Sequence, residues 1–497
     1  MLATKKVSDL LDRAVRVFPD RPAVLARDIT WTYRELGHRV VAAAEQLTAN
    51  GAFPSRVAIV GANSPAYVVA YFAAQAIGAT TVEVGHDESL DALVGVMRVA
   101  DPHVVVTDRY DLAGALPSHV TVFTFNELLE VVDDAPEATD LDAIERRDAD
   151  EAAVVFTSGT TGSPKGVVLT HDSILFVVRS VCEYLGLGPD DRRSLVLPLC
   201  HTYGKNNLLS AVMAGASIAL LEPFSDYAGF FNRIARDRCT VLSVVPFHLN
   251  VIARRGIPDD CDVSSVRAIT TSGAPLSPEV ADAIVELFPS ASLYSMYGLT
   301  EASTRVAFLP PELIAVKRGS VGRPLPGVVV QILSDGGSLL PPGSVGNVVV
   351  HGPNVMRGYL GDPELTAQTL IGGGLFTGDL GRLDDDGFLY LEGRRKDIIK
   401  VAGERISPVE IERVLMAHPA IADAAAIGLE DPLLDEAVCA FVVLRKGERT
   451  PSDLPQFCAA RLSHHKRPRR FHYIDAIPRT PTGKIRRHLL KKDAERA

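Results

Sequence analysis

Short apolar runs rich in β-branched residues alternate along most of this chain with longer segments whose apolar residues recur at helical spacing. The runs Arg56–Val60, His103–Thr107, Val154–Phe156 and Thr240–Val245 have the character of strands. The segment Thr32–Leu47 instead carries its apolar residues on one face of a helix. Because alternating strands and helices pack best as parallel sheets covered by helices, the pattern predicts an α/β fold.

The composition of the chain changes after about Gly319. From there to Gly393, short predicted strands alternate with segments rich in glycine and proline. A charged segment, 394–397, follows and is the expected hinge. The remaining segment has the elements of a small α+β domain, with helices at Pro408–Ala417 and Ser452–Leu462 and strands at Ala422–Ile427 and Ala437–Leu444. We therefore expect an N-terminal domain at 1–393, with a β-rich subdomain at about 319–393, and a C-terminal domain at 398–497.

Composition narrows the class of protein. The chain has 497 residues, 47% hydrophobic and 23% charged, which excludes disordered and fibrous proteins. A net charge of -10 argues against a nucleic-acid partner, which favours a basic surface. Six scattered cysteines without a CxxC pair indicate a reducing compartment. The N-terminus lacks a signal-peptide core, and the apolar stretch 208–221 is too short for a span, so we expect a cytoplasmic protein without stable membrane insertion.

A loop of glycines and hydroxyl residues, TSGTTGSPKG, lies between two β-rich runs. Its glycines let backbone N–H groups converge on an anion, while hydroxyls and a lysine add donors and charge. The candidates for binding phosphate are Thr157, Ser158, Gly159, Thr160, Thr161, Gly162 and Lys165. A Walker loop is excluded, because Lys165 precedes a glycine and a strand follows. A flexible hairpin tip is the alternative interpretation.

This signature and the motifs below, in the expected order along nearly the whole chain, resemble the adenylate-forming superfamily of acyl-CoA synthetases, peptide-synthetase adenylation domains and luciferases. The resemblance implies a large N-terminal domain with two parallel-type sheets and a small mobile C-terminal domain. It also implies ATP-dependent activation of a carboxylic acid to acyl-AMP with pyrophosphate release, followed by transfer to a thiol. ATP, Mg²⁺, and CoA or the phosphopantetheine of a carrier protein are the implied cofactors.

Two motifs match the nucleotide site of that superfamily. SGAPL is an ordinary turn by itself, and the resemblance assigns its Gly273, Ala274 and Pro275 to adenine. In YSMYGLTE the resemblance assigns Tyr297 and Gly298 to the adenine side and Thr300 to the α-phosphate. Glu301, a surface carboxylate by itself, becomes the implied magnesium ligand, which suits the preference of a hard cation for oxygen.

Three later motifs complete the resemblance. Asp379 and Arg394 match residues that bind ribose, and Lys484 in PRTPTGKIRR matches the lysine that acts between the carboxylate and the α-phosphate. Gly403 in KVAGERISPVEIE matches a loop that lets the pantetheine arm approach. This last segment also fits a helix start with Ser407 as cap and a glutamate three residues later.

The resemblance also places the acyl pocket beside His201, in the segment CHTYGKNN. A Cys–His nucleophile at this position is disfavoured, because no Asp or Asn partner is identifiable. Amino-acid-activating relatives carry an aspartate here, so its absence predicts an acid without an α-amino group. Four polar residues either accept a second polar group of the substrate or face away from the pocket: Lys205, Asn206, Asn207 and Arg305.

The acyl acceptor has three interpretations. CoA is favoured because the chain ends soon after Lys484 without a fused carrier domain. A stand-alone acyl-AMP ligase that loads an acyl carrier protein is the alternative. The third interpretation is a non-catalytic nucleotide-binding protein of the same fold, which retention of the charged motif residues argues against.

Overall fold

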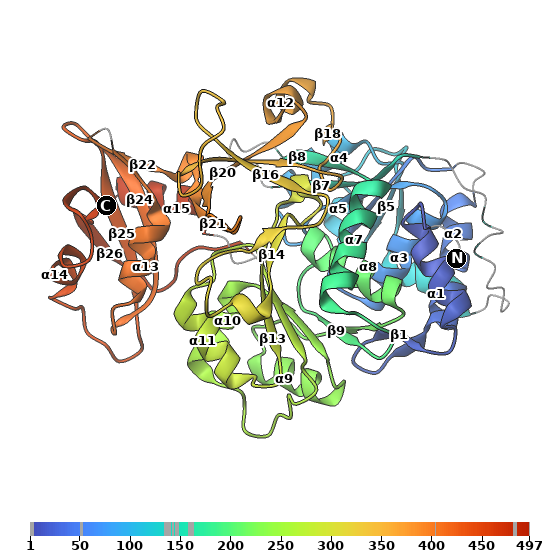
Figure 1. The fold of residues 1–497 in the computed structure, drawn as a ribbon. Helices are drawn as coiled ribbons and strands as arrows, with labels where there is room; N and C mark the ends of the chain where they lie inside the picture. Colours follow the sequence, from blue (N-terminus) through green and yellow to red (C-terminus); the bar gives the residue numbers. More distant parts are fainter. Residues whose placement is uncertain are drawn as a thin grey trace.

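The computed structural model describes residues 4–49, 53–133, 141, 144, 149–157, 164–402, 404–480 and 485–496. Four sheets organise this part of the chain (Figure 1). The helices are α1 (Ser8–Val17), α2 (Tyr33–Thr48), α3 (Pro65–Ala76), α4 (Leu90–Ala100), α5 (Tyr110–Ala113), α6 (Phe125–Asp133), α7 (His171–Leu185), α8 (Thr202–Ala214), α9 (Tyr227–Arg236), α10 (Pro246–Arg255), α11 (Pro278–Leu287), α12 (Pro363–Thr369), α13 (Pro408–Met416), α14 (Leu454–Ala459) and α15 (Arg487–Arg496).

Sheet A has nine strands in the order β15–β14–β13–β12–β11–β9–β10–β1–β2. Its strands are β1 (Pro22–Leu25), β2 (Thr30–Thr32), β9 (Arg192–Leu195), β10 (Ser217–Leu220), β11 (Val241–Val244), β12 (Ala268–Thr271), β13 (Ser292–Tyr297), β14 (Ala307–Leu309) and β15 (Arg323–Pro324). The run from β1 to β13 is parallel, and the two ends of the sheet are antiparallel. A parallel centre of this kind places the carboxyl ends of β11, β12 and β13 at one edge.

Sheet B has seven strands in the order β18–β8–β7–β4–β3–β5–β6. Its strands are β3 (Arg56–Val60), β4 (Thr80–Glu83), β5 (Val104–Thr107), β6 (Thr121–Phe123), β7 (Glu151–Thr157), β8 (Lys165–Thr170) and β18 (Gly358–Tyr359). Strand β7 is parallel to β4 but antiparallel to β8. The predicted phosphate loop therefore connects two adjacent antiparallel strands of a buried sheet.

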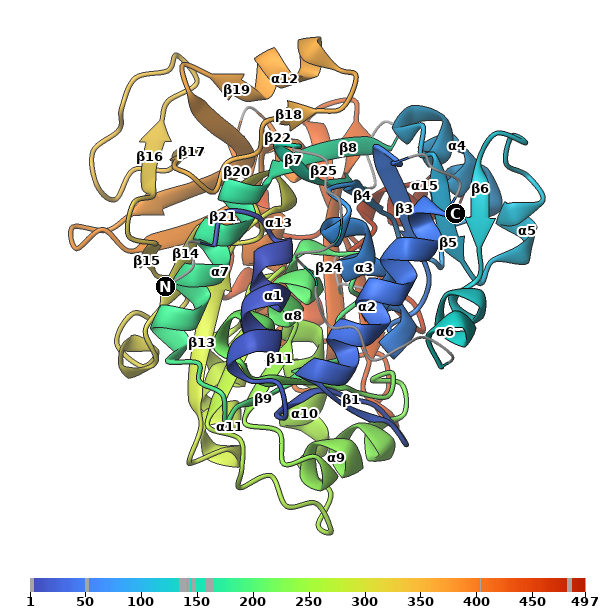
Figure 2. The same ribbon diagram turned by 90° about the vertical axis from the view of Figure 1, so that its right-hand side faces the viewer.

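One hydrophobic core joins sheets A and B through helices α1, α2, α3, α7 and α8. Figure 2 shows α1 and α2 side by side at the front of the molecule, with α8 packed behind α1. Helix α2 begins as the pattern predicts, because Thr32 and Glu35 form a reciprocal capping box. Helix α3 is apolar all round and buried along its length, as expected for a helix between two layers.

Sheet C contains β16 (Val329–Leu333), β17 (Gly346–His351), β19 (Leu370–Ile371), β20 (Gly374–Leu383) and β21 (Leu389–Arg394), all antiparallel. Not every strand after Gly319 belongs to it. Strand β15 completes the edge of sheet A, and β18 completes the edge of sheet B. Both strands are two residues long, which is too short for a periodicity that could assign them to a sheet.

Sheet D contains β22 (Ile399–Val401), β23 (Glu404–Ile406), β24 (Ile421–Asp431), β25 (Asp435–Leu444) and β26 (Arg470–Tyr473). It follows the short helix η4 (Arg395–Asp397) and has hydrophobic clusters separate from the main core. In Figure 1 this lobe, with α13 and α14, lies on the opposite side of the molecule from α1 and α2.

The predicted α/β class is confirmed, and two local predictions are wrong. Helix α14 spans only Leu454–Ala459, because the polar residues flanking it form turns. Ser407 precedes α13 but makes no capping bond, since its hydroxyl donates to the carbonyl of Glu392 and Glu410 binds Lys466 instead. Among the described residues, no helix is both long and apolar enough to cross a bilayer.

Candidate active site

Two of the predicted nucleotide segments leave adjacent strands at the same edge of sheet A. Gly273, Ala274 and Pro275 follow β12, and Gly298 follows β13, which pairs with β12 in parallel. Gly273 has φ +99, a conformation that favours glycine. A Cβ on Gly298 would lie 1.8 Å from the carbonyl oxygen of Thr304. The local backbone therefore requires glycine at both turns, and ligands of α/β sheets bind outside such carboxyl ends.

The strands on either side of the phosphate loop bring Lys165 toward Glu301. Thr157 and Lys165 are paired at the ends of β7 and β8. The Nζ of Lys165 lies 5.8 Å from the ring centroid of Tyr359, whose hydroxyl donates to Oε1 of Glu301 at 3.0 Å. Thr300 and Glu301 form the short helix η2 (Thr300–Ala302) directly after Gly298. The remaining predicted loop residues, Ser158, Gly159, Thr160, Thr161 and Gly162, lie outside the described residues.

A second cluster forms around Asp379. The hydroxyl of Tyr297 donates to its Oδ2 at 2.6 Å, and Nε of Arg394 lies 2.6 Å from its Oδ1. Burial and the adjacent carboxylate raise the pKa of Tyr297 well above its usual value, so the phenol stays a donor. Burial alone would lower the pKa of Arg394. The attraction of Asp379 and other anionic groups is larger than this effect, so the pKa of Arg394 is raised. Three predicted residues from two separate motifs thus meet at one point.

The segment predicted as a hinge lies beside this cluster. Lys396 belongs to η4 and is exposed by surface area, although neighbouring groups partly enclose its ammonium group. Burial lowers the pKa of Lys396, Asp397 opposes that effect, and the positive charges of Arg394 and Lys165 lower the pKa further. Positive charge from the phosphate loop and from η4 therefore converges on the nucleotide edge.

Gly403 and Lys484 lie outside the described residues, but the residues beside them are placed. Strands β22 and β23, which flank Gly403 in the sequence, pair through Val401 and Glu404. Arg479 bridges to Ile485, and its Nη2 binds Oδ1 of Asp423 at 2.8 Å. Both ends of the segment that carries Lys484 are therefore held by the C-terminal lobe.

His201 is at the N-cap of α8, largely buried. Burial lowers its pKa, and Asp87 opposes this weakly, so the imidazole is neutral at pH 7. Burial, with a contribution from Glu83, raises the pKa of the neighbouring Cys200 thiol to about 12. A thiol with that pKa is not a thiolate near neutral pH, which argues against a Cys–His nucleophile.

The polar residues of α8 have two different environments. Lys205 faces the core between the sheets, where its Nζ lies 3.2 Å from Oε1 of Glu83 and 3.4 Å from the ring centroid of Tyr71. Its charge is therefore balanced by a protein carboxylate. Asn207 faces sheet A, where its Oδ1 accepts a hydrogen bond from Nη2 of Arg193 at 2.6 Å.

Sequence reasoning missed several residues of this site. Tyr359 connects Glu301 with Lys165, and no local pattern distinguishes it from other tyrosines. Polar side chains also lie inside the strands of sheet A: Arg193, Ser243 and Thr270. The arginine directly before the largely apolar run SLVLPL was the signal that could have revealed this group.

Magnesium fits the donor set at this edge. Glu301 presents one carboxylate, and the described residues contain no group of three or more His, Cys, Asp or Glu able to hold a metal. Mg²⁺ characteristically binds through one or two carboxylates together with nucleotide phosphates rather than through a protein cage.

The chain is similar to known proteins along most of its length. The AMP-binding enzyme family matches residues 11–360, and the AMP-binding enzyme C-terminal domain matches residues 410–484. The 4-coumarate–CoA ligase 2 of Nicotiana tabacum is 32% identical over 95% of this chain and 92% of its own length. A 2-succinylbenzoate–CoA ligase of Bacillus cereus is 32% identical over 98% of both chains.

A solved structure agrees along almost the whole chain. The o-succinylbenzoate CoA synthetase of Bacillus subtilis, in complex with its acyl-adenylate intermediate, has a TM-score of 0.86 at 31% identity and covers 97% of both chains. The same enzyme has been solved with ATP and a magnesium ion, with a TM-score of 0.86 at 31% identity over 97% of this chain and 99% of that chain.

Proposed function

We propose that this chain, which belongs to the AMP-binding enzyme family, uses ATP to convert a carboxylic acid to acyl-AMP and then transfers the acyl group to CoA. The observation that carries the proposal is the convergence of charged groups from separate motifs at one sheet edge. Asp379, Arg394 and Tyr297 form one cluster there, and Glu301 and Lys165 meet through Tyr359. Retention of these groups together with Lys484 argues against a non-catalytic nucleotide-binding protein.

The first half-reaction joins two anions. A carboxylate oxygen attacks the α-phosphorus of ATP, and the bond to the bridging oxygen breaks as pyrophosphate leaves with the electron pair. Fixed positive charge and hydrogen-bond donors are therefore the main requirement, rather than a nucleophilic side chain. We assign Lys165, Thr300 and the hydroxyls of residues 157–161 to the phosphates, and Lys484 to the space between the carboxylate and the α-phosphorus.

Glu301 is the residue that we assign to Mg²⁺, which when bound neutralises phosphate charge. Gly273, Ala274, Pro275 and Gly298 bound the space for adenine. We assign Asp379, held by Tyr297 and Arg394, to the ribose hydroxyls, because a carboxylate accepts two donors from one sugar.

The second half-reaction requires a different set of groups. The sulfur of a thiol bonds to the acyl carbon, its proton passes to solvent, and AMP leaves with the electron pair. We propose that residues 398–497 turn about a hinge at 394–397, so that Lys484 withdraws and the turn at Gly403 approaches. Such gating also keeps water from the reactive acyl-AMP.

The substrate is proposed to be an acid without an α-amino group. The segment around His201 has no aspartate to bind an ammonium group, and the relatives are named for 4-coumarate and 2-succinylbenzoate. CoA is the proposed acceptor because both relatives are CoA ligases by name. A carrier-protein thiol is the alternative acceptor.

Pyrophosphate release measured with a panel of acids tests the proposal. We expect release that depends on ATP, Mg²⁺ and one class of acid, and a thioester when CoA is added. Thioester formation only with a carrier protein would replace CoA as acceptor. Tight ATP binding without turnover of any acid would favour the non-catalytic interpretation.

A further inference from the structure

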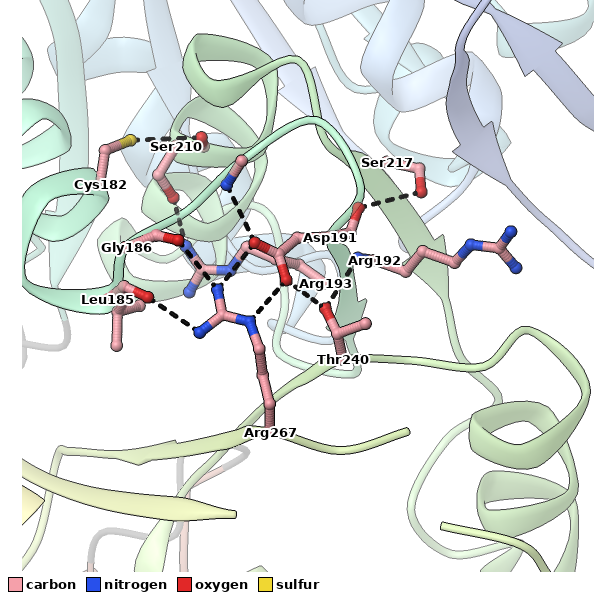
Figure 3. A network of polar contacts seen from close by, with 11 residues as sticks. Cys182, Leu185, Gly186, Asp191, Arg192, Arg193, Ser210, Ser217, Thr240 and Arg267 are labelled. Atoms are coloured by element: carbon pink, nitrogen blue, oxygen red, sulfur yellow. Dashed lines mark hydrogen bonds and ion pairs between the residues drawn. The ribbon is translucent and has the colours of Figure 1, made fainter. Parts of the chain in front are cut away.

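Two arginines are buried inside sheet A without a protein anion to balance them. Arg193 and Arg305 are each 1% exposed. Among the residues that the structure describes, no carboxylate forms an ion pair with either guanidinium. Asp191, two residues before Arg193, is turned instead toward Arg267 and Thr240, as Figure 3 shows, with Nη2 of Arg267 2.7 Å from its Oδ2.

Such an arrangement is unfavourable in the protein alone. A guanidinium cannot lose its proton at any ordinary pH, and a buried charge without a counter-ion is strongly destabilising. The other buried arginine of this lobe, Arg233, follows the usual rule, because its Nη2 lies 2.6 Å from Oδ2 of Asp237. The unbalanced pair therefore calls for an anion from outside the chain.

Arg193 is held by neutral acceptors that orient it. Its Nη2 donates to Oδ1 of Asn207 at 2.6 Å and to Oγ of Ser243 at 3.2 Å. Its Nη1 donates to Ser210, the one of these contacts that Figure 3 shows. Thr270 donates to Ser243 at 3.1 Å. The result is a continuous polar network on one face of a parallel sheet whose core is otherwise apolar.

Arg305 approaches the same network from the segment between η2 and β14. Its guanidinium carbon lies 5.2 Å from the ring centroid of Tyr203, whose hydroxyl shares a hydrogen bond of 2.9 Å with Thr270. Its Nε and Nη1 are fully buried and have no hydrogen-bond partner among the described residues. Nε–H and Nη1–H point to different sides of the guanidinium, so each is available as a single donor to an anionic oxygen.

The backbone before Arg305 directs this side chain inward. Ser303 and Thr304 have φ values of +49 and +77, which are rare for residues with a Cβ and especially for a β-branched one. Nδ2 of Asn354 donates to the carbonyl of Arg305 at 2.8 Å and holds the strained segment in place. Backbone strain that the surroundings maintain is characteristic of functional positions.

The network is bonded to two elements that carry predicted site residues, β12 and α8. Thr270 precedes Gly273 by three residues, or about 10 Å along a strand. Asn207 follows His201 by six residues, or about 9 Å along a helix. Because Tyr203 on α8 and Thr270 on β12 share a hydrogen bond, both spacings lead to the same polar network.

We propose that Arg305 and Arg193 bind a second carboxylate at the distal end of the acid, so that this enzyme activates dicarboxylic acids. The inference rests on the proposed function and names its substrate class. Lys205 is not part of this subsite, because Glu83 already balances its charge. The paired guanidiniums recognise the distal group, while the other carboxylate reacts at phosphorus.

The first test compares dicarboxylates from succinate to suberate with their half-methyl esters in acid-dependent pyrophosphate release. An ester removes the distal charge and keeps the chain. We expect kcat/KM for at least one dicarboxylate to exceed that for its half-ester by about a hundredfold. The neutral ester would leave the buried guanidinium of Arg305 without a counter-ion. Equal turnover of both members at every length would overturn the inference and leave the proposed function standing.

The second test uses Arg305→Met and Arg193→Met, which keep an apolar side chain of similar reach. Both variants should lose the preference for the dicarboxylate, and Arg305→Met should turn over the half-ester at least as well as the wild type does. Retained turnover shows that the variant is folded. The double variant Glu83→Leu/Lys205→Met removes a buried cation from α8, the helix that carries Asn207, and it should keep the preference for the dicarboxylate. A preference that persists without Arg305 would contradict the assignment.

A binding measurement without ATP separates the two proposals. The preferred dicarboxylate should raise the Tm of the wild type and leave that of Arg305→Met unchanged. Removing an unbalanced charge should leave the Tm of the ligand-free variant equal to or above that of the wild type. A large loss of Tm in ligand-free Arg305→Met would mean that the arginine is structural. Binding without any acid-dependent pyrophosphate release would refute the adenylation chemistry instead.

Discussion

Replacing Asp379 tests the nucleotide site most sharply, because its two oxygens are engaged by different donors. The Tyr297 hydroxyl donates at 2.6 Å and Nε of Arg394 lies at 2.6 Å. The Asp379→Asn variant keeps the shape but loses the charge and places an amide donor against one of these donors. A hydrogen bond to a charged group contributes about 1.5–3 kcal/mol, so we expect kcat/KM for ATP to fall roughly 10- to 150-fold.

The assay compares ATP with 3′-deoxy-ATP in acid-dependent pyrophosphate release. The wild type should prefer ATP by about tenfold or more, because the analogue lacks a hydroxyl that Asp379 accepts. In Asp379→Asn the preference should largely vanish, since the analogue and the variant remove the same bond. Tyr297→Phe is the matched control, because it keeps the carboxylate and should keep the preference. Additive losses from the analogue and from Asp379→Asn would refute the assignment to ribose.

Three further predictions concern the core, acid stability and the C-terminal lysine. Glu83→Gln leaves the charge of Lys205 unbalanced in the core and should lower the free energy of unfolding by about 3–5 kcal/mol. The double variant Glu83→Leu/Lys205→Met should recover the Tm. An unchanged Tm in Glu83→Gln would contradict the pairing. Burial lowers the pKa of His248 from 6.5 to about 4, so the folded state disfavours its charged form, and stability that is complete above pH 6.5 is lost as pH falls toward 4. His248 is stacked on Phe224, so His248→Phe keeps an aromatic ring at this position. The variant should show a smaller drop in Tm between about pH 7 and pH 5 than the wild type. An identical drop would exclude His248 as a cause of the loss of stability in acid. Lys484→Ala should abolish acyl-AMP formation yet spare thioester formation from supplied acyl-AMP, and equal loss of both would speak against two domain arrangements.

Local patterns predicted much of the fold because strand and helix periodicity depends on neighbouring residues. Strand β3 has the predicted bounds, Arg56–Val60, and α2 starts one residue after the predicted Thr32, which serves as its cap. The order of strands within the sheets was not predictable in this way. It depends on packing between segments far apart in sequence, such as the pairing of β1 with β10.

The same distinction applies to the site. Asp379 and Arg394 carried recognisable motifs, and the structure brings them together at 2.6 Å. The polarity of Lys205 and Arg305 was visible in the sequence, but their partners were not. Lys205 on α8 pairs with Glu83 on β4, whereas Arg305 forms no ion pair with a carboxylate among the described residues. Only the three-dimensional arrangement separates a balanced cation from an unbalanced one.

Exchange of labelled pyrophosphate into ATP tests the central claim most directly, because it requires reversible formation of acyl-AMP at the assembled charges. We predict exchange that depends on both Mg²⁺ and the acid, proceeds without CoA, and is lost in Lys484→Ala. Cleavage of ATP to ADP and phosphate, or exchange that is indifferent to the acid, would contradict adenylation of a carboxylate at this site.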